Sequence, residues 1–134
     1  MNRRRTTLNG MILLAALVSL SLAPMGCSPT LVGENTAAYS MGKLHARIDR
    51  EMNAVYEASV KALEALEIGV TEQKKDVFAA RVAGKTADER TITIRMEPEG
   101  EASTLLSIRT GVIGGETEAR ARAIYDKIRE ILGQ

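Results

Sequence analysis

Aromatic residues are scarce in this chain of 134 residues. Three Tyr and one Phe, with no Trp, make up 3% of the sequence. Any hydrophobic core must therefore be built mainly from aliphatic side chains and be of modest size. Single-stranded nucleic acid is an unfavoured ligand, because proteins that bind it stack bases on exposed rings. The formal net charge of +1 gives no overall bias towards nucleic acid either.

Cysteine and histidine each occur once, as Cys27 and His45. A single cysteine excludes an intramolecular disulfide framework. A metal centre needs clustered ligands, and Ser–His–Asp chemistry would have to use His45, which lacks a recognisable nucleophile motif nearby. We therefore expect no metal, no cofactor and a non-enzymatic role. A small enzyme or an accessory subunit with an unrecognised site is the alternative.

A hydrophobic run long enough to cross a membrane is also missing. The longest apolar segment, MILLAALVSLSLA at residues 11–23, falls short of the roughly 20 residues that a span requires. Three arginines precede it, and Gly26 and Cys27 follow it. This order is typical of a bacterial lipoprotein signal peptide, which is cleaved before an acylated cysteine. Pro24 and Met25 are unusual for such a cleavage site, and the alternatives are an uncleaved anchor, a plain secreted form or a cytosolic protein without a signal peptide.

The N-terminal pattern predicts three parts of the chain. Residues 1–26 are a signal peptide, residues 27–38 a flexible tether that begins at the lipidated (palmitate-bearing) Cys27, and residues 39–133 a folded domain. Ser28 follows the cysteine in place of Asp. By resemblance to Gram-negative lipoproteins, this implies the periplasmic side of the outer membrane, with an inner-membrane anchor as the alternative.

Hydrophobic periodicity predicts an α+β domain. Residues 39–48 alternate as one strand, and a helix of about 18 residues follows Asp49 as its N-cap. Residues 68–73, 76–85, 90–97 and 102–110 are expected to be strands, and Thr117 is expected to cap a final helix. The order is β-α-β-β-β-β-α. It predicts a two-layer sandwich, in which an antiparallel sheet of four to five strands carries two helices on one face. The side chains expected to point inward from the strands are Leu44, Ala46, Ile48, Phe78, Ala80, Val82, Ile92, Ile94, Met96, Leu106 and Ile108.

The glycine-rich segment before the last helix, IRTGVIGGETEA, is interpreted as a structural turn. It has neither the lysine of a Walker loop nor the spacing of a dinucleotide-binding loop. Glu116 and Glu118 would also repel a phosphate at this helix terminus.

The strand phases place a set of basic residues on the sheet face away from the helices. Thr91, Thr93 and Ser107 lie among them, and Glu97 is the only acid expected there. One interpretation is an ordinary solvated sheet face. The other is a platform for an anionic envelope component or a partner protein; pairing of two copies through the sheet or an edge strand is a third possibility. The basic residues of this candidate binding face are Lys43, His45, Arg47, Arg81, Lys85, Arg95 and Arg109.

The segments YSMGKLHARI, VYEASVKALEALEIGV and SIRTGVIGGE, followed by a terminal amphipathic helix, resemble a family of small bacterial lipoproteins. The family shares a Tyr-Ser-x-Gly-x-Leu strand and an Ile-Arg-x-Gly-x-x-Gly exit turn, and it is catalogued only as a domain of unknown function. Here Gly115 precedes Glu116, so the acid that the family places after the second glycine is shifted by one. The resemblance covers about residues 39–132. It implies a lipid-anchored domain that faces the periplasm, and no activity or catalytic residue.

Overall fold

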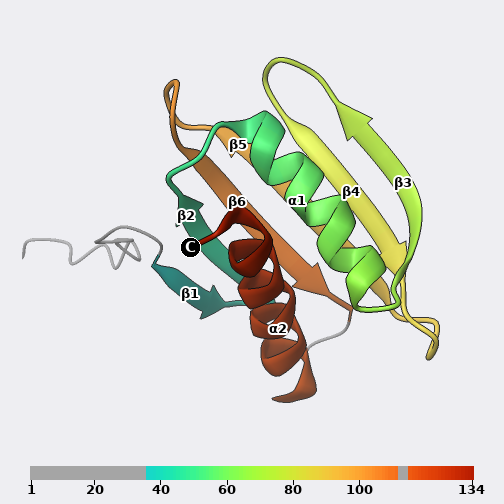
Figure 1. Ribbon diagram of the computed structural model, residues 1–134. Coiled ribbons are helices and arrows are strands. Elements are labelled where there is room, and N and C mark those ends of the chain that lie inside the picture. The colour runs from blue at the N-terminus through green and yellow to red at the C-terminus, as the bar shows by residue number, and fades with distance from the viewer. Residues whose placement is uncertain (1–35, 112–114) are drawn as a thin grey trace, which may run out of the picture.

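The computed structural model describes residues 36–111 and 115–134, which form six strands and two helices (Figure 1). Cys27 and the expected signal peptide lie outside the described residues. The elements in chain order are β1 (Ala37–Ser40), β2 (Lys43–Ile48), α1 (Met52–Ala65), β3 (Gly69–Lys75), β4 (Ala80–Lys85), β5 (Thr91–Pro98), β6 (Thr104–Thr110) and α2 (Gly115–Leu132).

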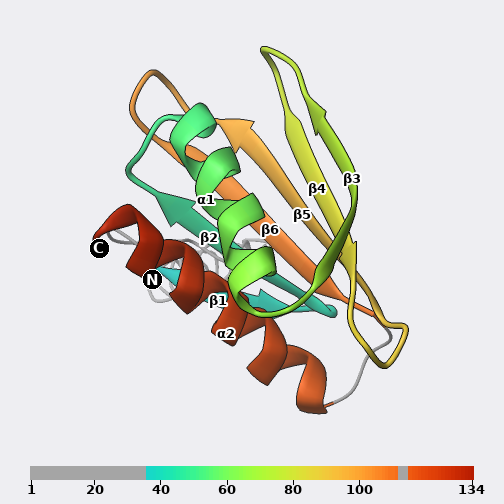
Figure 2. The same cartoon turned by 45° about the vertical axis from the view of Figure 1, so that its right-hand side comes forward.

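The strands form one antiparallel sheet in the order β1-β2-β6-β5-β4-β3. Both helices lie on the same side of it and contact each other (Figure 2). Helix α1 packs on β3, β4 and β5, and α2 packs on β2 and β6. Neither helix in the described part of the chain is both long and apolar enough to cross a membrane. The predicted α+β sandwich is confirmed, with six strands in place of four to five.

The sixth strand arises because residues 39–48 form a hairpin and not one strand. Met41 and Gly42 both have positive φ, 50° and 76°, as a two-residue turn between antiparallel strands requires. Strand β1 begins at Ala37, two residues before the domain boundary expected from the sequence, and Ala37 pairs with Ala46 of β2. The hydroxyls of Tyr39 and Thr117, whose oxygens are 2.7 Å apart, then connect β1 to α2.

The core between sheet and helices is aliphatic, as expected. The predicted inward residues of β2, β5 and β6 are all buried, and so are Ala80 and Val82 of β4. Helix α2 adds Ile124 and Ile128, whereas Ile131 near its end is 37% exposed. Among the described residues, those of the buried core lie between Leu44 and Ile128, and the chain without residues 1–26 retains all of them.

Both predicted N-caps are wrong. Helix α1 is capped by Glu51 without a side-chain hydrogen bond, and Asp49 instead pairs with Arg47, with Oδ1 and Nε 3.5 Å apart. Helix α2 begins at Gly115, so Thr117 lies in its first turn and is 3% exposed. The backbone carbonyl of Thr117 accepts a hydrogen bond from the Thr110 hydroxyl, with an oxygen–oxygen distance of 2.7 Å.

Phe78 was expected to point into the core, but it is 83% exposed at the tip of the β3–β4 hairpin. Asp76 explains the difference. Its carboxylate Oδ1 accepts hydrogen bonds from the backbone N–H groups of Phe78 and Ala79, at 2.7 and 2.9 Å. A side chain that bonds its own backbone in this way forms a turn and ends the strand ladder. Residues 76–79 therefore connect the two strands, and β4 begins only at Ala80.

Gly84 of β4 is buried where the sheet meets the end of α1. A Cβ added there would lie 2.9 Å from Cγ2 of Ile68 and 3.0 Å from the backbone oxygen of Gly69. We expect Gly84→Ala to lower the free energy of unfolding by about 1–3 kcal/mol, the usual cost of overpacking a core. Gly69→Ala is the matched control, because its Cβ would meet only the Lys85 oxygen at 3.7 Å. Urea denaturation of both variants measures the difference, and equal stabilities would contradict the expectation.

Candidate anion-binding face

The sheet surface away from the helices, here called the open face, carries the basic residues predicted from the sequence. Alternate residues of β2, β4, β5 and β6 are buried against the helices, so the residues between them point to the opposite side. In the orientation of Figure 1 the helices lie in front of the sheet and the open face lies behind it. The predicted residues on this face are Lys43, His45, Arg47, Arg81, Lys85, Arg95 and Arg109.

Strand register places four of these cations in two directly opposed pairs. Arg81 of β4 faces Arg95 of β5, and Lys43 of β2 faces Arg109 of β6. Two hydroxyls occupy the intervening positions, since Ser107 faces Arg95 and Thr93 faces Arg109. Like charges directly opposite each other destabilise a sheet. This arrangement is therefore a cost to the fold unless an anion balances it.

The same six residues line an open depression of about 230 Å³. Its walls come from four adjacent strands, β2, β6, β5 and β4, so the depression lies near the middle of the sheet. The fold therefore gathers residues that are up to 66 positions apart in the sequence into one polar, cationic site. The lining residues are Lys43, Arg81, Thr93, Arg95, Ser107 and Arg109.

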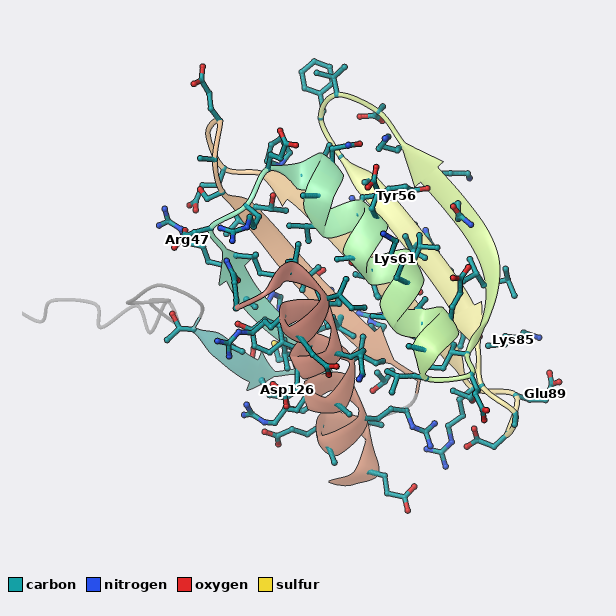
Figure 3. All side chains as sticks on the ribbon, in the orientation of Figure 1. Arg47, Tyr56, Lys61, Lys85, Glu89 and Asp126 are labelled. Atoms are coloured by element: carbon teal, nitrogen blue, oxygen red, sulfur yellow. The ribbon has the colours of Figure 1, made fainter. Side chains whose placement is uncertain are left out.

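Carboxylates balance the charges of Arg47 and Lys85, two other basic residues of the open face. The Nε atom of Arg47 lies 3.1 Å from a carboxylate oxygen of Glu99, and the Lys85 ammonium lies 3.3 Å from Glu89. Figure 3 shows Arg47 and Lys85 at opposite corners of the sheet, and Glu89 near Lys85. Both residues thus stand apart from the central depression and contribute little unbalanced charge to it.

The four cations of the depression have weak carboxylate partners or none. The nearest ion pairs of Arg81 and Arg95, to Glu72 and Glu97, are long at 3.8 and 3.7 Å. Within the described residues, Lys43 and Arg109 make no ion pair. The positive charge at the centre of the face is therefore largely unbalanced.

Strand β3 places one acid, Glu72, beside this cluster, and the principal partner of Glu72 is Lys74. The Lys74 ammonium lies 2.9 Å from Oε1 of Glu72. This hydrogen bond, with a further contribution from Arg81, lowers the pKa of the Glu72 carboxyl below its ordinary value. Glu72 consequently stays ionised but is shared between two cations, and it does not neutralise Arg81 alone.

A second depression of about 220 Å³ adjoins the first and shares Arg95 and Ser107 with it. It is lined in addition by His45, Glu97, Leu105 and Leu106. Leu105 is 37% exposed and gives this part of the face an apolar surface. The open face is thus cationic in one depression and mixed in the other.

Comparison with known proteins identifies the family of the chain. Residues 11–130 match a family model described as a protein of unknown function, DUF3568. The chain belongs to the DUF3568 family. The resemblance to a family of unknown function is therefore confirmed, and the family description carries no activity. No curated protein matches the chain.

Two features of the site in this DUF3568 domain were not predicted from its sequence. Glu72 and Lys74 join the open face because the β3–β4 register shifts between Val70 and Glu72, a bulge that periodicity does not show. The expectation that Glu97 is the only acid on this face is therefore wrong. Leu105 lies on the open face by the same alternation as Ser107 and Arg109, but as an apolar residue it was not included among the candidate binding residues. In the part of the chain that the structure describes, His, Cys, Asp and Glu form no group able to hold a metal ion.

Proposed function

We propose that this DUF3568 protein is a lipid-anchored, non-enzymatic binding module of the bacterial cell envelope. Cys27 carries the lipid, and the domain is displayed in the periplasm on the inner side of the outer membrane. The open face contacts an anionic component of the envelope. The observation that carries the binding role is the pair of opposed cations, Arg81 with Arg95 and Lys43 with Arg109, which the described residues leave largely unbalanced.

The distribution of charge in the domain supports a contact between the open face and an anionic surface. Exposed carboxylates are numerous on the helices, and two of these, Asp126 on α2 and Glu57 on α1, lie on the opposite side of the domain from the depression. The helices also carry five basic residues beside their six acids and are therefore close to neutral, so the unbalanced positive charge lies on the open face. Such a distribution steers the open face towards an anionic surface. The lipid would hold the domain close to such a surface, where each cation adds about 1 kcal/mol of attraction.

Reversal of two central charges tests the proposal. We expect the combined variant Arg95→Glu and Arg109→Glu, made in the soluble chain 28–134, to lose retention on anionic material. The expected loss is at least about tenfold, because two cations that each contribute about 1 kcal/mol become repulsive. Co-sedimentation with phosphatidylglycerol-containing vesicles and with purified cell-wall sacculi measures the retention.

The matched control reverses two charges on the helix layer, Lys61→Glu and Arg122→Glu, which gives the same change in net charge. Both side chains are exposed, and Lys61 on α1 points away from the sheet in Figure 3. We expect this control to retain most of the binding. Equal retention of the wild type and the Arg95/Arg109 variant on both materials would exclude the proposed role of the open face.

A further inference from the structure

The central depression has the size of a site for a small group. Pockets that hold drug-sized ligands span about 300–1,000 Å³. The depression measures about 230 Å³ and is open to solvent, so it admits a compact anionic group and not a large ligand. Its outline therefore favours one charged group held from several sides.

The donors around the depression match the requirements of a phosphate group. A phosphate monoester carries close to two negative charges at pH 7 and three acceptor oxygens. Arg81, Arg95 and Arg109 each present a planar fork of N–H donors, which suits phosphate oxygens better than a single point charge does. Lys43 adds an ammonium, and the hydroxyls of Thr93 and Ser107 add neutral donors between the cations.

We propose that this depression binds the phosphate group of a small phosphate ester. The assignment rests on the proposed function, and it names the chemical class that the open face recognises. A dianion removes the repulsion within both opposed pairs at once, because Arg81–Arg95 and Lys43–Arg109 border the same space. A carboxylate, with one charge, would balance only part of it.

The adjoining depression accommodates the substituent of the ester. It shares Arg95 and Ser107 with the first depression, and the partly exposed side chain of Leu105 gives it an apolar lining. The carboxylate of Glu97 disfavours a second anionic group there and accepts hydrogen bonds from hydroxyls. The substituent is therefore an uncharged, hydroxyl-bearing group such as glycerol.

The test titrates the isotope-labelled soluble chain 28–134 with glycerol 3-phosphate and with inorganic phosphate, followed by amide chemical shifts. We expect saturable shifts at the backbone amides of residues 93, 95, 107 and 109, with tighter binding of the ester than of inorganic phosphate. Equal affinities would overturn the assignment of the second depression. The phosphate site would be overturned if none of the three ligands, glycerol 3-phosphate, inorganic phosphate and the vesicles described below, gave saturable binding.

Three variants separate a built site from a diffuse positive field. We expect Arg109→Gln to weaken glycerol 3-phosphate binding about tenfold and Ser107→Ala about fivefold, since hydrogen bonds to a charged ligand are the strong ones. Lys85→Gln removes one cation from the same face but outside the depression, where Lys85 pairs with Glu89, and we expect a change below about twofold, because exposed charges interact weakly in water. Equal weakening by Arg109→Gln and Lys85→Gln would show that only net charge matters and would overturn the proposal.

A phosphate ester has two sources in an envelope, a soluble metabolite or a lipid headgroup. Vesicles of phosphatidylcholine that contain phosphatidic acid present the same monoester on a membrane. Binding to glycerol 3-phosphate in solution identifies a soluble source, and binding only to phosphatidic acid vesicles, still lost in Ser107→Ala, identifies a headgroup. Either result supports the phosphate site.

The outcomes also distinguish this site from the proposed function. Retention on anionic vesicles that depends on Arg95 and Arg109, without any saturable phosphate binding, would leave the proposed function in place and remove the phosphate site. The reverse result is saturable phosphate binding that depends on Arg109 and Ser107, together with vesicle retention that the Arg95/Arg109 reversal does not change. It would support the phosphate site and remove the proposed function.

Discussion

Replacement of Cys27 by Ser is expected to release the protein from membranes and to abolish its labelling by radioactive palmitate. The chain has no other cysteine, so no second thiol can accept the acyl groups. Each buried methylene of an acyl chain contributes about 0.8 kcal/mol to membrane binding, and two or more chains hold a domain almost permanently. The loss should therefore be nearly complete, whereas changes on the open face only alter the strength of a contact.

Ser28→Ala is a suitable control for this experiment, because it changes the adjacent residue without touching the acceptor thiol. We expect it to keep both the palmitate label and the membrane fraction. The Cys27→Ser protein should in addition keep the uncleaved residues 1–26, which mass measurement of the whole chain detects. Persistent labelling of Cys27→Ser would show that the lipoprotein assignment is wrong.

The sequence predicted the layers of this domain well, because period-two and helical patterns report directly which side of an element is buried. Leu44, Ile94 and Ile108, each inward in the strand pattern, are all fully buried. The same alternation predicted which cations point to the open face. These predictions succeed because they depend only on residues within a single element.

The failures are local and arise where turn chemistry overrides an apolar pattern. Met41–Gly42 turns the chain although it lacks the Asn-Gly or Asp-Gly pair that usually signals a hairpin. Asp76 bonds the backbone of Phe78 and so ends the strand that this aromatic residue suggested. Two backbone hydrogen bonds to one carboxylate thus accompany a turn that leaves Phe78 in solvent and not in the core.

The site itself depends on strand order, which a strand pattern does not contain. Lys43 and Arg109 become neighbours because β2 lies beside β6, although α1 and three strands separate them in the chain. The opposed pair Arg81–Arg95 depends in turn on the register of the β4–β5 hairpin. The sequence thus identified most of the basic residues of the open face, and only the fold shows which four of them surround one depression.

Ile94→Ala is expected to lower the free energy of unfolding by about 2–5 kcal/mol, the usual cost of such a truncation in a packed core. Ile94 is 0% exposed in β5, and it lies between Val82 of β4 and Ile108 of β6, which are also 0% exposed. Rigid strands on both sides prevent the cavity from collapsing. A small domain has only about 5–15 kcal/mol in total, so the variant should unfold at a much lower urea concentration.

Phe78→Ala is the matched comparison, because the sequence pattern placed both side chains in the core. Phe78 is 83% exposed, and the turn around it is held by Asp76 through backbone N–H groups that the substitution retains. We expect its stability to stay within about 0.5 kcal/mol of the wild type, as for most surface changes. Urea denaturation of the two variants, with unchanged slope, measures the contrast. A loss for Phe78→Ala as large as that for Ile94→Ala would mean that the hairpin tip packs against the domain after all.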